Sequence, residues 1–229
     1  MSLFQTATVN CPACSKPVEF GVVDSLNADR RPDLRAAILD RSFQTQRCAC
    51  GETFRLEPRM TYLDVRRKQW ILVEPLHKLA EWSALEEKAR TTFEAAYGAR
   101  AAAAARKVAV GMQVRVTFGW AALHEKLLCR EHGIDDVILE IIKATLLRTQ
   151  PNTPLADDTE LRLVDVLDDK LRMCWLRATT EGILEDLRIP RSLCDDITSD
   201  PDGYQRLSSQ LTAGPFVDLH RVLVPATGK

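Results

Sequence analysis

The sequence lacks any long uninterrupted apolar run. Crossing a bilayer takes about 20 consecutive apolar residues, and the most apolar stretch, residues 137–147, is broken by Glu140 and Lys143. The first residues, MSLFQTATVNC, contain neither the basic region nor the apolar core that marks a secretory signal. These absences argue against a membrane protein and predict a cytoplasmic location.

A large charge of one sign is also missing. The 31 Lys and Arg residues nearly balance 32 Asp and Glu residues, which leaves a net charge of −1. Proteins that bind nucleic acid usually carry a basic surface, so binding of that kind would need a local patch. Hydrophobic residues at 45% and charged residues at 28% are ordinary for a folded globular protein.

Cysteine occurs seven times, and four of the seven stand in two close pairs, Cys11 with Cys14 and Cys48 with Cys50. Secreted proteins that are held together by disulfides usually contain an even number of cysteines. Closely spaced pairs of cysteines in a protein from a reducing compartment are instead typical of metal sites. Structural zinc sites use four such ligands in a tetrahedron and leave no open position. We therefore predict a structural zinc site at these four residues.

Residues beside the two pairs favour tight turns around a metal. Pro12 fixes one φ angle in the first turn, and Gly51 allows a positive φ directly after the second pair. Lys16 and Arg47 can temper the negative charge of a zinc tetrathiolate. Four ordinary cysteines remain an alternative, and so does a redox dithiol. The redox interpretation needs a helix after its first cysteine to lower the thiol pKa, but the residues that follow the first pair predict a strand.

Apolar periodicity and turn-forming residues divide the chain into three parts. Residues 1–75 predict a zinc-ribbon-like module of short strands with an inserted helix over 32–39. Residues 76–110 predict a long linking helix with an apolar stripe from Trp82 to Phe93, interrupted at Gly98 and continued by an alanine run at 101–105. Residues 111–229 predict a module of helices and a small antiparallel sheet, so the fold class is α+β. We expect strands at 18–23, 41–47, 53–57, 60–65, 69–73, 112–118, 161–167, 170–177 and 216–224, and further helices at 120–132, 135–147 and starting at Pro190 and Pro201.

Several of these residues together resemble the bacterial CpXC-domain family. The matching motifs are Cys11-Pro12-x-Cys14, Ser25-Leu26-Asn27, Pro32-Asp33-Leu34, Cys48-x-Cys50-Gly51 and Tyr62-Leu63-Asp64. The segment with Phe118-Gly119-Trp120, Leu123-His124-Glu125-Lys126 and Gly133-Ile134-Asp135-Asp136 is similar to the region that follows this domain in such proteins. The chain departs from the family in its shorter second pair and in Ser15, where a glycine is common. The resemblance implies a zinc module and assigns no biochemical activity.

A second candidate site is acidic. Asp136 and Glu140 share one face of a predicted helix, and with Glu125 they could hold a divalent metal or act in acid–base catalysis. The structural alternative is helix capping with carboxylates that favour a helix N-terminus. Because no histidine, nucleophile or glycine-rich loop accompanies them in the sequence, we favour that alternative. Glu125 with Lys126, and Glu140 with Lys143, are then interpreted as solvated helix charges.

Basic residues offer a third candidate, a nucleic-acid interface. If the short strands bring them together around the zinc site, they form a patch beside which Phe43 and Trp70 could stack on bases. These residues are Arg41, Arg47, Arg66, Arg67 and Lys68. The alternative is a surface with ordinary, scattered charge.

No combination of residues points to catalysis, so we expect a protein that is not an enzyme. The leading interpretation is a zinc-stabilised cytoplasmic interaction or adaptor protein of a bacterial assembly. Its linking helix would dock a protein partner or a second copy. The alternatives are a nucleic-acid-binding zinc ribbon and a metal-dependent enzyme that uses the acidic helix. Neither a membrane nor a small-molecule substrate is indicated.

Overall fold

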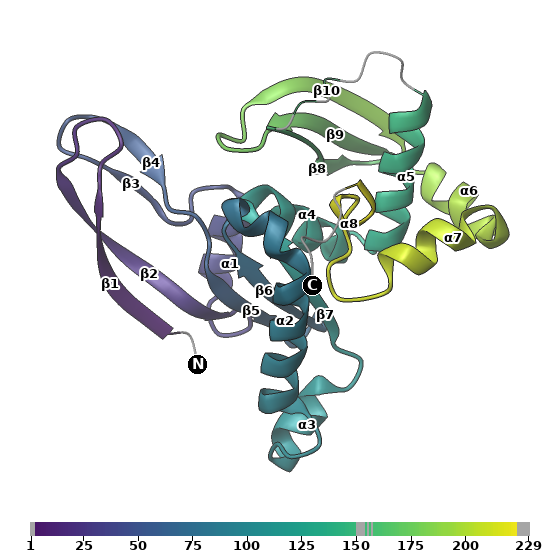
Figure 1. Cartoon of the computed structure of the whole chain (residues 1–229), viewed down its shortest axis with the longest axis horizontal. Coiled ribbons are helices and arrows are strands. Elements are labelled where there is room, and N and C mark those ends of the chain that lie inside the picture. Colours follow the sequence, from purple (N-terminus) through teal and green to yellow (C-terminus); the bar gives the residue numbers. More distant parts are fainter. Residues whose placement is uncertain (1–2, 150–153, 155, 157, 224–229) are drawn as a thin grey trace.

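Three sheets and the helices between them build an α+β fold, as predicted (Figure 1). The computed structural model describes residues 3–149, 154, 156 and 158–223. The strands are β1 (Leu3–Asn10), β2 (Pro17–Asn27), β3 (Thr45–Arg47), β4 (Thr53–Arg55), β5 (Met60–Asp64), β6 (Gln69–Glu74), β7 (Gln113–Phe118), β8 (Thr159–Leu167), β9 (Lys170–Arg177) and β10 (Ile183–Pro190). The helices are α1 (Pro32–Leu39), the 3₁₀ helix η1 (Leu76–Glu81), α2 (Trp82–Tyr97), α3 (Ala103–Ala109), α4 (Gly119–Glu131), α5 (Asp136–Thr149), α6 (Leu193–Ser199), α7 (Pro201–Leu211) and α8 (His220–Leu223). Among the described residues, no helix combines the length and the apolar character that a membrane crossing requires.

The largest sheet has five strands in the order β1-β2-β5-β6-β7. The pairs β1–β2 and β5–β6 are antiparallel, whereas β2–β5 and β6–β7 are parallel. A parallel pair needs a long crossover connection, which residues 75–112 supply. The sheet thus joins strands on both sides of the boundary predicted between residues 110 and 111, with Gln69 of β6 opposite Gln113 of β7. The division into domains itself stays a prediction.

The linking segment is helical, and the interruption predicted at Gly98 is confirmed, so the segment is divided into separate helices. It consists of η1, α2 and α3, and α2 ends at Gly98, whose ψ of −165° is extended. A Cβ atom at Gly98 would lie only 2.5 Å from the backbone oxygen of Glu94. The Glu94 carboxylate also accepts a hydrogen bond of 3.1 Å from the backbone N–H of Ala99. This local capping stops the helix despite the alanine-rich sequence that follows.

The apolar stripe of α2 packs inside the molecule, against one face of the five-stranded sheet. Trp82 and Ala89 are buried in the same cluster as Trp70, and the rings of Trp70 and Phe93 lie 5.5 Å apart. All six residues of β6 are buried, as expected for a strand covered on both faces. The sheet therefore already covers this stripe, and the docking of a partner to the linking segment stays a prediction.

Helix α4 lies between two sheets. On one side Trp120 and Leu123 pack with α1 against the five-stranded sheet, and on the other side α4 contacts β8. Every residue from 119 to 129 is buried in consequence. A helix enclosed in this way is usually apolar all round, yet α4 carries His124, Glu125 and Lys126 in its middle. The buried charges discussed below follow from this position.

The second sheet is antiparallel, in the order β10-β9-β8, and α5, α6 and α7 pack beside it. The predicted hairpin is confirmed, with Leu167 opposite Lys170 and a positive φ at Asp168. Pro190 ends β10 instead of starting a helix, so that prediction is wrong. The predicted strand at 216–224 is also wrong, because residues 216–219 are irregular and α8 follows. Residue 224 lies outside the described residues.

Candidate metal centre

Two hairpins form an arm that projects from the rest of the fold (Figure 1). We use "arm" for residues 3–23 and 44–56, which hold β1, most of β2, β3 and β4. The two hairpins meet at their tips, where Phe20 and Phe54 pack edge to face with ring centres 5.2 Å apart. The amide of Gln46 donates a hydrogen bond of 3.3 Å to the backbone oxygen of Glu19. Each tip carries one pair of cysteines.

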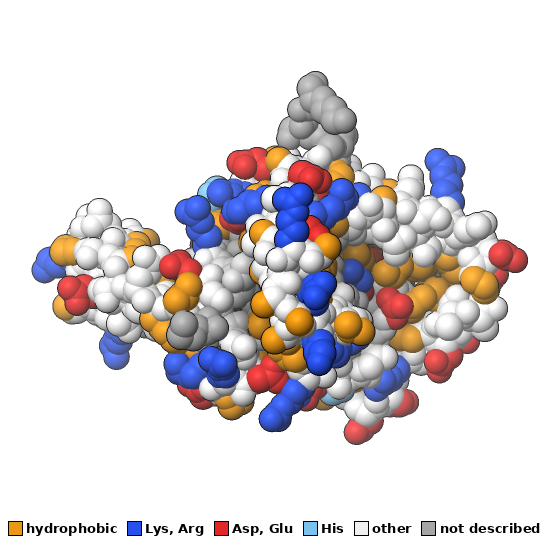
Figure 2. Space-filling view, turned by 90° about the horizontal axis from the view of Figure 1, so that it is seen from below, with side chains coloured by type: hydrophobic (Ala, Val, Ile, Leu, Met, Phe, Trp, Pro, Cys, Tyr) orange, Lys and Arg blue, Asp and Glu red, His pale blue; other side chains and the backbone are white. Residues whose placement is uncertain are grey.

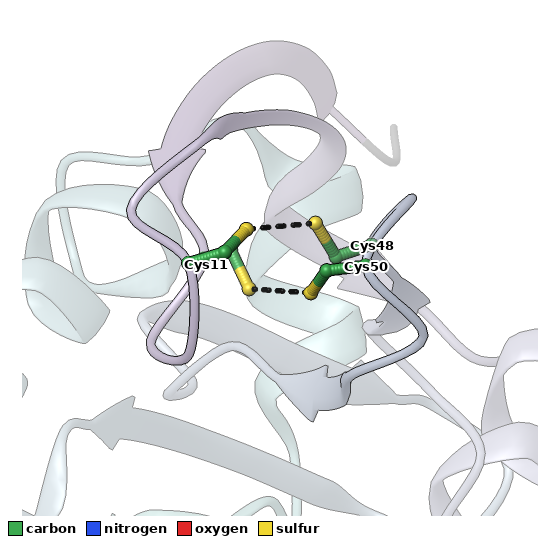
Figure 3. A group of neighbouring side chains, drawn as sticks. Cys11, Cys48 and Cys50 are labelled. Carbon is green, nitrogen blue, oxygen red and sulfur yellow. Dashed lines mark hydrogen bonds between the residues drawn. The ribbon is translucent and has the colours of Figure 1, made fainter.

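Both cysteine pairs lie in tight turns closed by backbone hydrogen bonds. In the first turn, the N–H of Cys11 donates to the oxygen of Lys16 at 2.9 Å, and Ser15 has a positive φ of 57°. In the second turn, the N–H of Cys48 donates to the oxygen of Glu52 at 2.8 Å. Gly51 has the positive φ that we predicted, at 98°. The turns hold the two pairs opposite each other (Figure 3).

The spacing of the four sulfur atoms matches a tetrahedral metal site. The Sγ atoms of Cys11 and Cys50 lie 3.7 Å apart, and those of Cys14 and Cys48 lie 3.6 Å apart. All four sulfurs lie within 4.8 Å of one another. A tetrahedron with zinc–sulfur bonds of about 2.3 Å has an edge of about 3.8 Å. The residues therefore fit a metal ion bound by four thiolates, although sulfur ligands alone do not identify the metal.

The sulfurs also influence each other's ionisation. Burial opposes ionisation of Cys11, but backbone N–H groups of the turn outweigh it and lower the pKa to about 7. The N–H of Lys16 would lower the pKa of Cys14, but burial and the sulfurs of the second pair outweigh it and raise the pKa to about 12. Thiols this close resist losing all their protons unless a cation lies between them, and a metal ion would supply that charge.

The structure does not gather the predicted basic residues around the metal centre. Arg47 lies next to Cys48, but Arg66, Arg67 and Lys68 form the turn between β5 and β6. That turn lies at the opposite end of β2, about 30 Å away along the strand. Figure 2 shows few basic side chains on the arm, and those on the central part alternate with acidic and apolar ones.

The other members of the predicted patch have different neighbours. Arg41 follows α1 with a positive φ of 64°, and its charge contributes to lowering the pKa of the buried His124. Phe43 and Trp70 are buried, so neither ring is free to stack on a base. The described residues thus provide no single basic surface that contains all five predicted side chains.

The acidic candidate residues are buried, and basic partners neutralise them. The Nζ atom of Lys143 lies 2.6 Å from Glu125 and 2.8 Å from Glu140. Asp136 accepts two hydrogen bonds, of 2.7 and 2.9 Å, from the guanidinium of Arg115. Our interpretation of these groups as solvated helix charges is wrong, because α4 and α5 turn them into the interior instead of towards water.

Further partners come from β8 and from the segment after α7. Arg162 of β8 contacts Glu125 at 3.1 Å and Asp218 at 2.5 Å. The backbone N–H of Leu219 donates to Glu140 at 3.0 Å. We call the set the buried charge network; its members are Arg115, Glu125, Lys126, Asp136, Glu140, Lys143, Glu160, Arg162, Asp218 and His220. It ties α4, α5, β7, β8 and the residues before α8 into one unit.

The charges in this network determine what it can do chemically. Oxygen atoms of Glu125, Glu140 and Asp218 lie within 4.8 Å of one another, a spacing that could suit a cation. However, the positively charged side chains of Lys143 and Arg162 already contact these carboxylates and take the place of a metal ion. Burial alone would raise the pKa of Glu125, but these two cations outweigh it and hold the pKa below its ordinary value. The arrangement is typical of a structural ion network.

Sequence reasoning missed Arg162, Asp218 and His220. Arg162 alternates with apolar residues in β8, a pattern that indicates a solvent-facing side chain in a half-buried strand. It is buried because α4 covers that face of the strand. The sequence contains only a weak signal for this network, namely charged residues of opposite sign within α4, α5 and β8. Nothing in the sequence shows that these elements lie side by side.

Comparison of the chain with curated proteins and with solved structures finds no match in either. A family model described as CpXC protein does match, over residues 9–143. The matched span contains both cysteine pairs, ends at Lys143 of the buried charge network and covers well over half of the 229 residues. This chain is thus a member of the CpXC protein family.

Proposed function

We propose that the chain is a zinc-stabilised interaction protein, in which one Zn²⁺ holds the arm in the shape that a partner protein recognises. The convergence of four cysteine sulfurs at near-tetrahedral spacing carries the proposal. Tetrahedral sites with four sulfur ligands suit zinc or iron. We favour zinc because a site that only braces two turns needs no change of oxidation state.

The arm has little else to hold its hairpins in place. Most residues of β1 are exposed, and so are all three residues of β3. In small zinc-dependent peptides the metal contributes about 10–16 kcal/mol to folding. A metal at the tips would therefore decide whether the two hairpins keep a fixed arrangement, and a fixed arrangement lowers the entropic cost of binding.

The proposal includes no catalytic role. Four protein ligands fill the coordination sphere of zinc and leave no position for a substrate or a water molecule. The acidic side chains considered for catalysis are paired with Lys143, Arg162 and Arg115. We place the protein in a bacterial cytoplasm, where reducing conditions suit seven cysteines that are all free of disulfides.

Metal analysis and partner capture test the proposal together. Native mass spectrometry of the purified full chain is expected to show one zinc ion per chain. Cys48→Ser should lose the metal, whereas Cys194→Ser, which changes a half-buried cysteine of α6, should keep it. The tagged wild type and Cys194→Ser should recover the same partner from the native cell, and Cys48→Ser should not. A chain without metal, a chain with iron, or capture that is unaffected by Cys48→Ser would overturn the proposal.

A further inference from the structure

The outer edge of β1 is open in the part of the chain that the structure describes. β1 is the last strand of its sheet and pairs only with β2. All eight residues from Leu3 to Asn10 are exposed or half-buried, and the side chains of Leu3 and Phe4 keep 55% and 51% of their surface in contact with solvent. The strand, LFQTATVN, contains no charge, proline or glycine. An edge of this kind is a template for pairing with another strand.

The other long edges of the molecule are protected, which makes β1 distinctive. The edge of β7 is covered by the segment before α8, since the N–H of Val116 donates to the oxygen of Pro215 at 3.0 Å. The edge of β8 lies against α4, where the N–H of Leu163 donates to Glu125 at 2.7 Å. β10 carries three charged residues and ends in Pro190, and both charges and proline discourage pairing. Among the strands that the structure describes, only β1 has an edge with no covering segment and no charged residue of its own.

The composition of β1 favours a second copy of the same strand as its occupant. Two identical strands related by a two-fold axis perpendicular to the sheet run antiparallel, so each residue of β1 faces a residue of β1 in the second copy. Because β1 has no charged residue, no register places like charges opposite each other. With Thr6 opposite Thr6, Leu3 faces Val9 on the same face of the sheet. The exposed apolar end of each strand thus meets an apolar residue of the other.

We propose that β1 pairs antiparallel with β1 of a second copy, so that the two five-stranded sheets become one continuous sheet across a two-fold axis. The metal centre follows Asn10 at the end of β1, so the two metal centres would lie at opposite ends of the shared strand pair. This inference goes beyond the proposed function, since it needs the arm but no adaptor role. Failure to capture a foreign partner would leave it intact.

Light scattering on the zinc-loaded full chain tests the pairing. The wild type should change from a mass of 25.7 kDa to twice that value as its concentration is raised. Thr6→Lys with Thr8→Lys places like charges near each other in any register close to full overlap, and this variant should remain monomeric. The matched control, Thr91→Lys with Thr179→Lys, makes the same two changes at exposed threonines away from β1 and should dimerise like the wild type.

A charge swap makes the test specific for β1. Thr6→Glu with Thr8→Glu should also be monomeric alone, and an equimolar mixture of the Lys and Glu variants should recover the double mass, which also shows that both variants are folded. A wild type that is monomeric at every concentration would overturn the inference. So would a dimer that survives the Lys substitutions, or a mixture that stays monomeric.

Discussion

Single side chains in the buried charge network depend on one another, because an ion that leaves water must find an opposite charge. Lys143 is the clearest case, since its side chain is 2% exposed and bridges two carboxylates. Glu140 depends on it most. Burial raises the pKa of Glu140 even with Lys143 and Lys126 nearby. Loss of Lys143 would therefore make the ionised form of Glu140 still less stable in the interior.

We expect Lys143→Met to destabilise the protein by about 3–5 kcal/mol, because it removes the cation nearest to both Glu125 and Glu140 and leaves excess negative charge in the interior. Urea denaturation of the zinc-loaded chain measures this loss. The control is Lys107→Met, the same substitution at an exposed position of α3, which should change stability by less than about 0.5 kcal/mol. Equal losses in both variants would contradict a stabilising role of the ion pairs around Lys143.

His220 gives the network a dependence on pH. Its Nδ1 atom lies 2.7 Å from Oδ1 of Asp218. Burial alone would lower the pKa of His220, but the Asp218 carboxylate outweighs it and raises the pKa above the ordinary 6.5. Protonated His220 therefore stabilises the fold fully below pH 6.5, and this stabilisation is lost as the pH rises through the raised pKa.

We expect the free energy of unfolding of the wild type to fall relative to that of His220→Gln between about pH 6 and pH 8.5, because only the wild type loses the protonated His220. Urea denaturation at the two pH values compares the wild type with the variant. His124 acts in the opposite direction, because burial lowers its pKa in the folded state to about 4 while its unfolded imidazole still releases a proton near the ordinary value. Both proteins contain His124, so the comparison cancels its contribution. If the wild type and His220→Gln lose the same stability with rising pH, the assignment to His220 is wrong.

Among the helices, the linking segment could be one continuous helix or a helix that stops at Gly98, and a substitution at Gly98 distinguishes the two. In one continuous helix, Gly98→Ala would stabilise the protein by about 1 kcal/mol, because alanine is the better helix former. In the structure, the new methyl group would meet the backbone oxygen of Glu94 at 2.5 Å. We therefore expect Gly98→Ala to destabilise by about 1 kcal/mol or more. Thermal unfolding of the wild type and Gly98→Ala measures the change in stability: an increase would indicate one continuous helix, and a decrease would indicate a helix that stops at Gly98.

Elements with strong local signals could be predicted from the sequence. Pro32 fixes the start of α1, which the structure confirms over Pro32–Leu39. The turn at Asp168 and the positive φ at Gly51 were also predicted from local chemistry. The cysteine cluster belongs with them, because two close pairs have few other uses. In each case a few neighbouring residues determine the conformation without help from the rest of the chain.

Elements whose role depends on distant partners could not be predicted. Periodicity identified β7 as a strand but could not show that it pairs with β6 across the intervening helices. The same limit applies to α4, whose sequence is compatible with one solvated face. Its charges are buried because α5, β8 and the segment before α8 cover the side that faces away from the five-stranded sheet. β10 was missed because Pro190 indicated a helix start, although proline is also tolerated at the end of an edge strand.

Across the entire fold, the span matched by the family model is not an independent packing unit. Residues 9–143 contain Glu125 and Lys143, but their partners Arg162 and Asp218 lie beyond it. The same span leaves out the β8–β10 sheet that covers α4. Membership in the family therefore describes a shared segment, and the stability of that segment in this chain depends on residues that follow it.

We expect a fragment of residues 1–143, which keeps all of β1 and ends where the family match ends, to lose cooperative unfolding even with zinc bound. In this fragment α4 would expose both apolar surface and unpaired charges. Circular dichroism during thermal unfolding, with the zinc-loaded full chain as reference, measures the change. Metal content of the fragment serves as the control, since an intact metal centre shows that the arm itself has folded. A cooperative transition near that of the full chain would contradict the dependence on later residues.

The parallel pairing of β6 with β7 has a consequence for protein synthesis. Strand β6 is buried along its whole length, yet α2, β7 and α4, which cover it, all follow it in the sequence. When β6 leaves the ribosome, α1 is the only one of its covering helices already made, so much of this apolar strand is exposed until α2, β7 and α4 follow. The metal-binding tips need only residues that precede β6, so they can fold first. Until its later covering elements are made, β6 is then the segment of the nascent chain that is most able to associate non-specifically with other apolar surfaces.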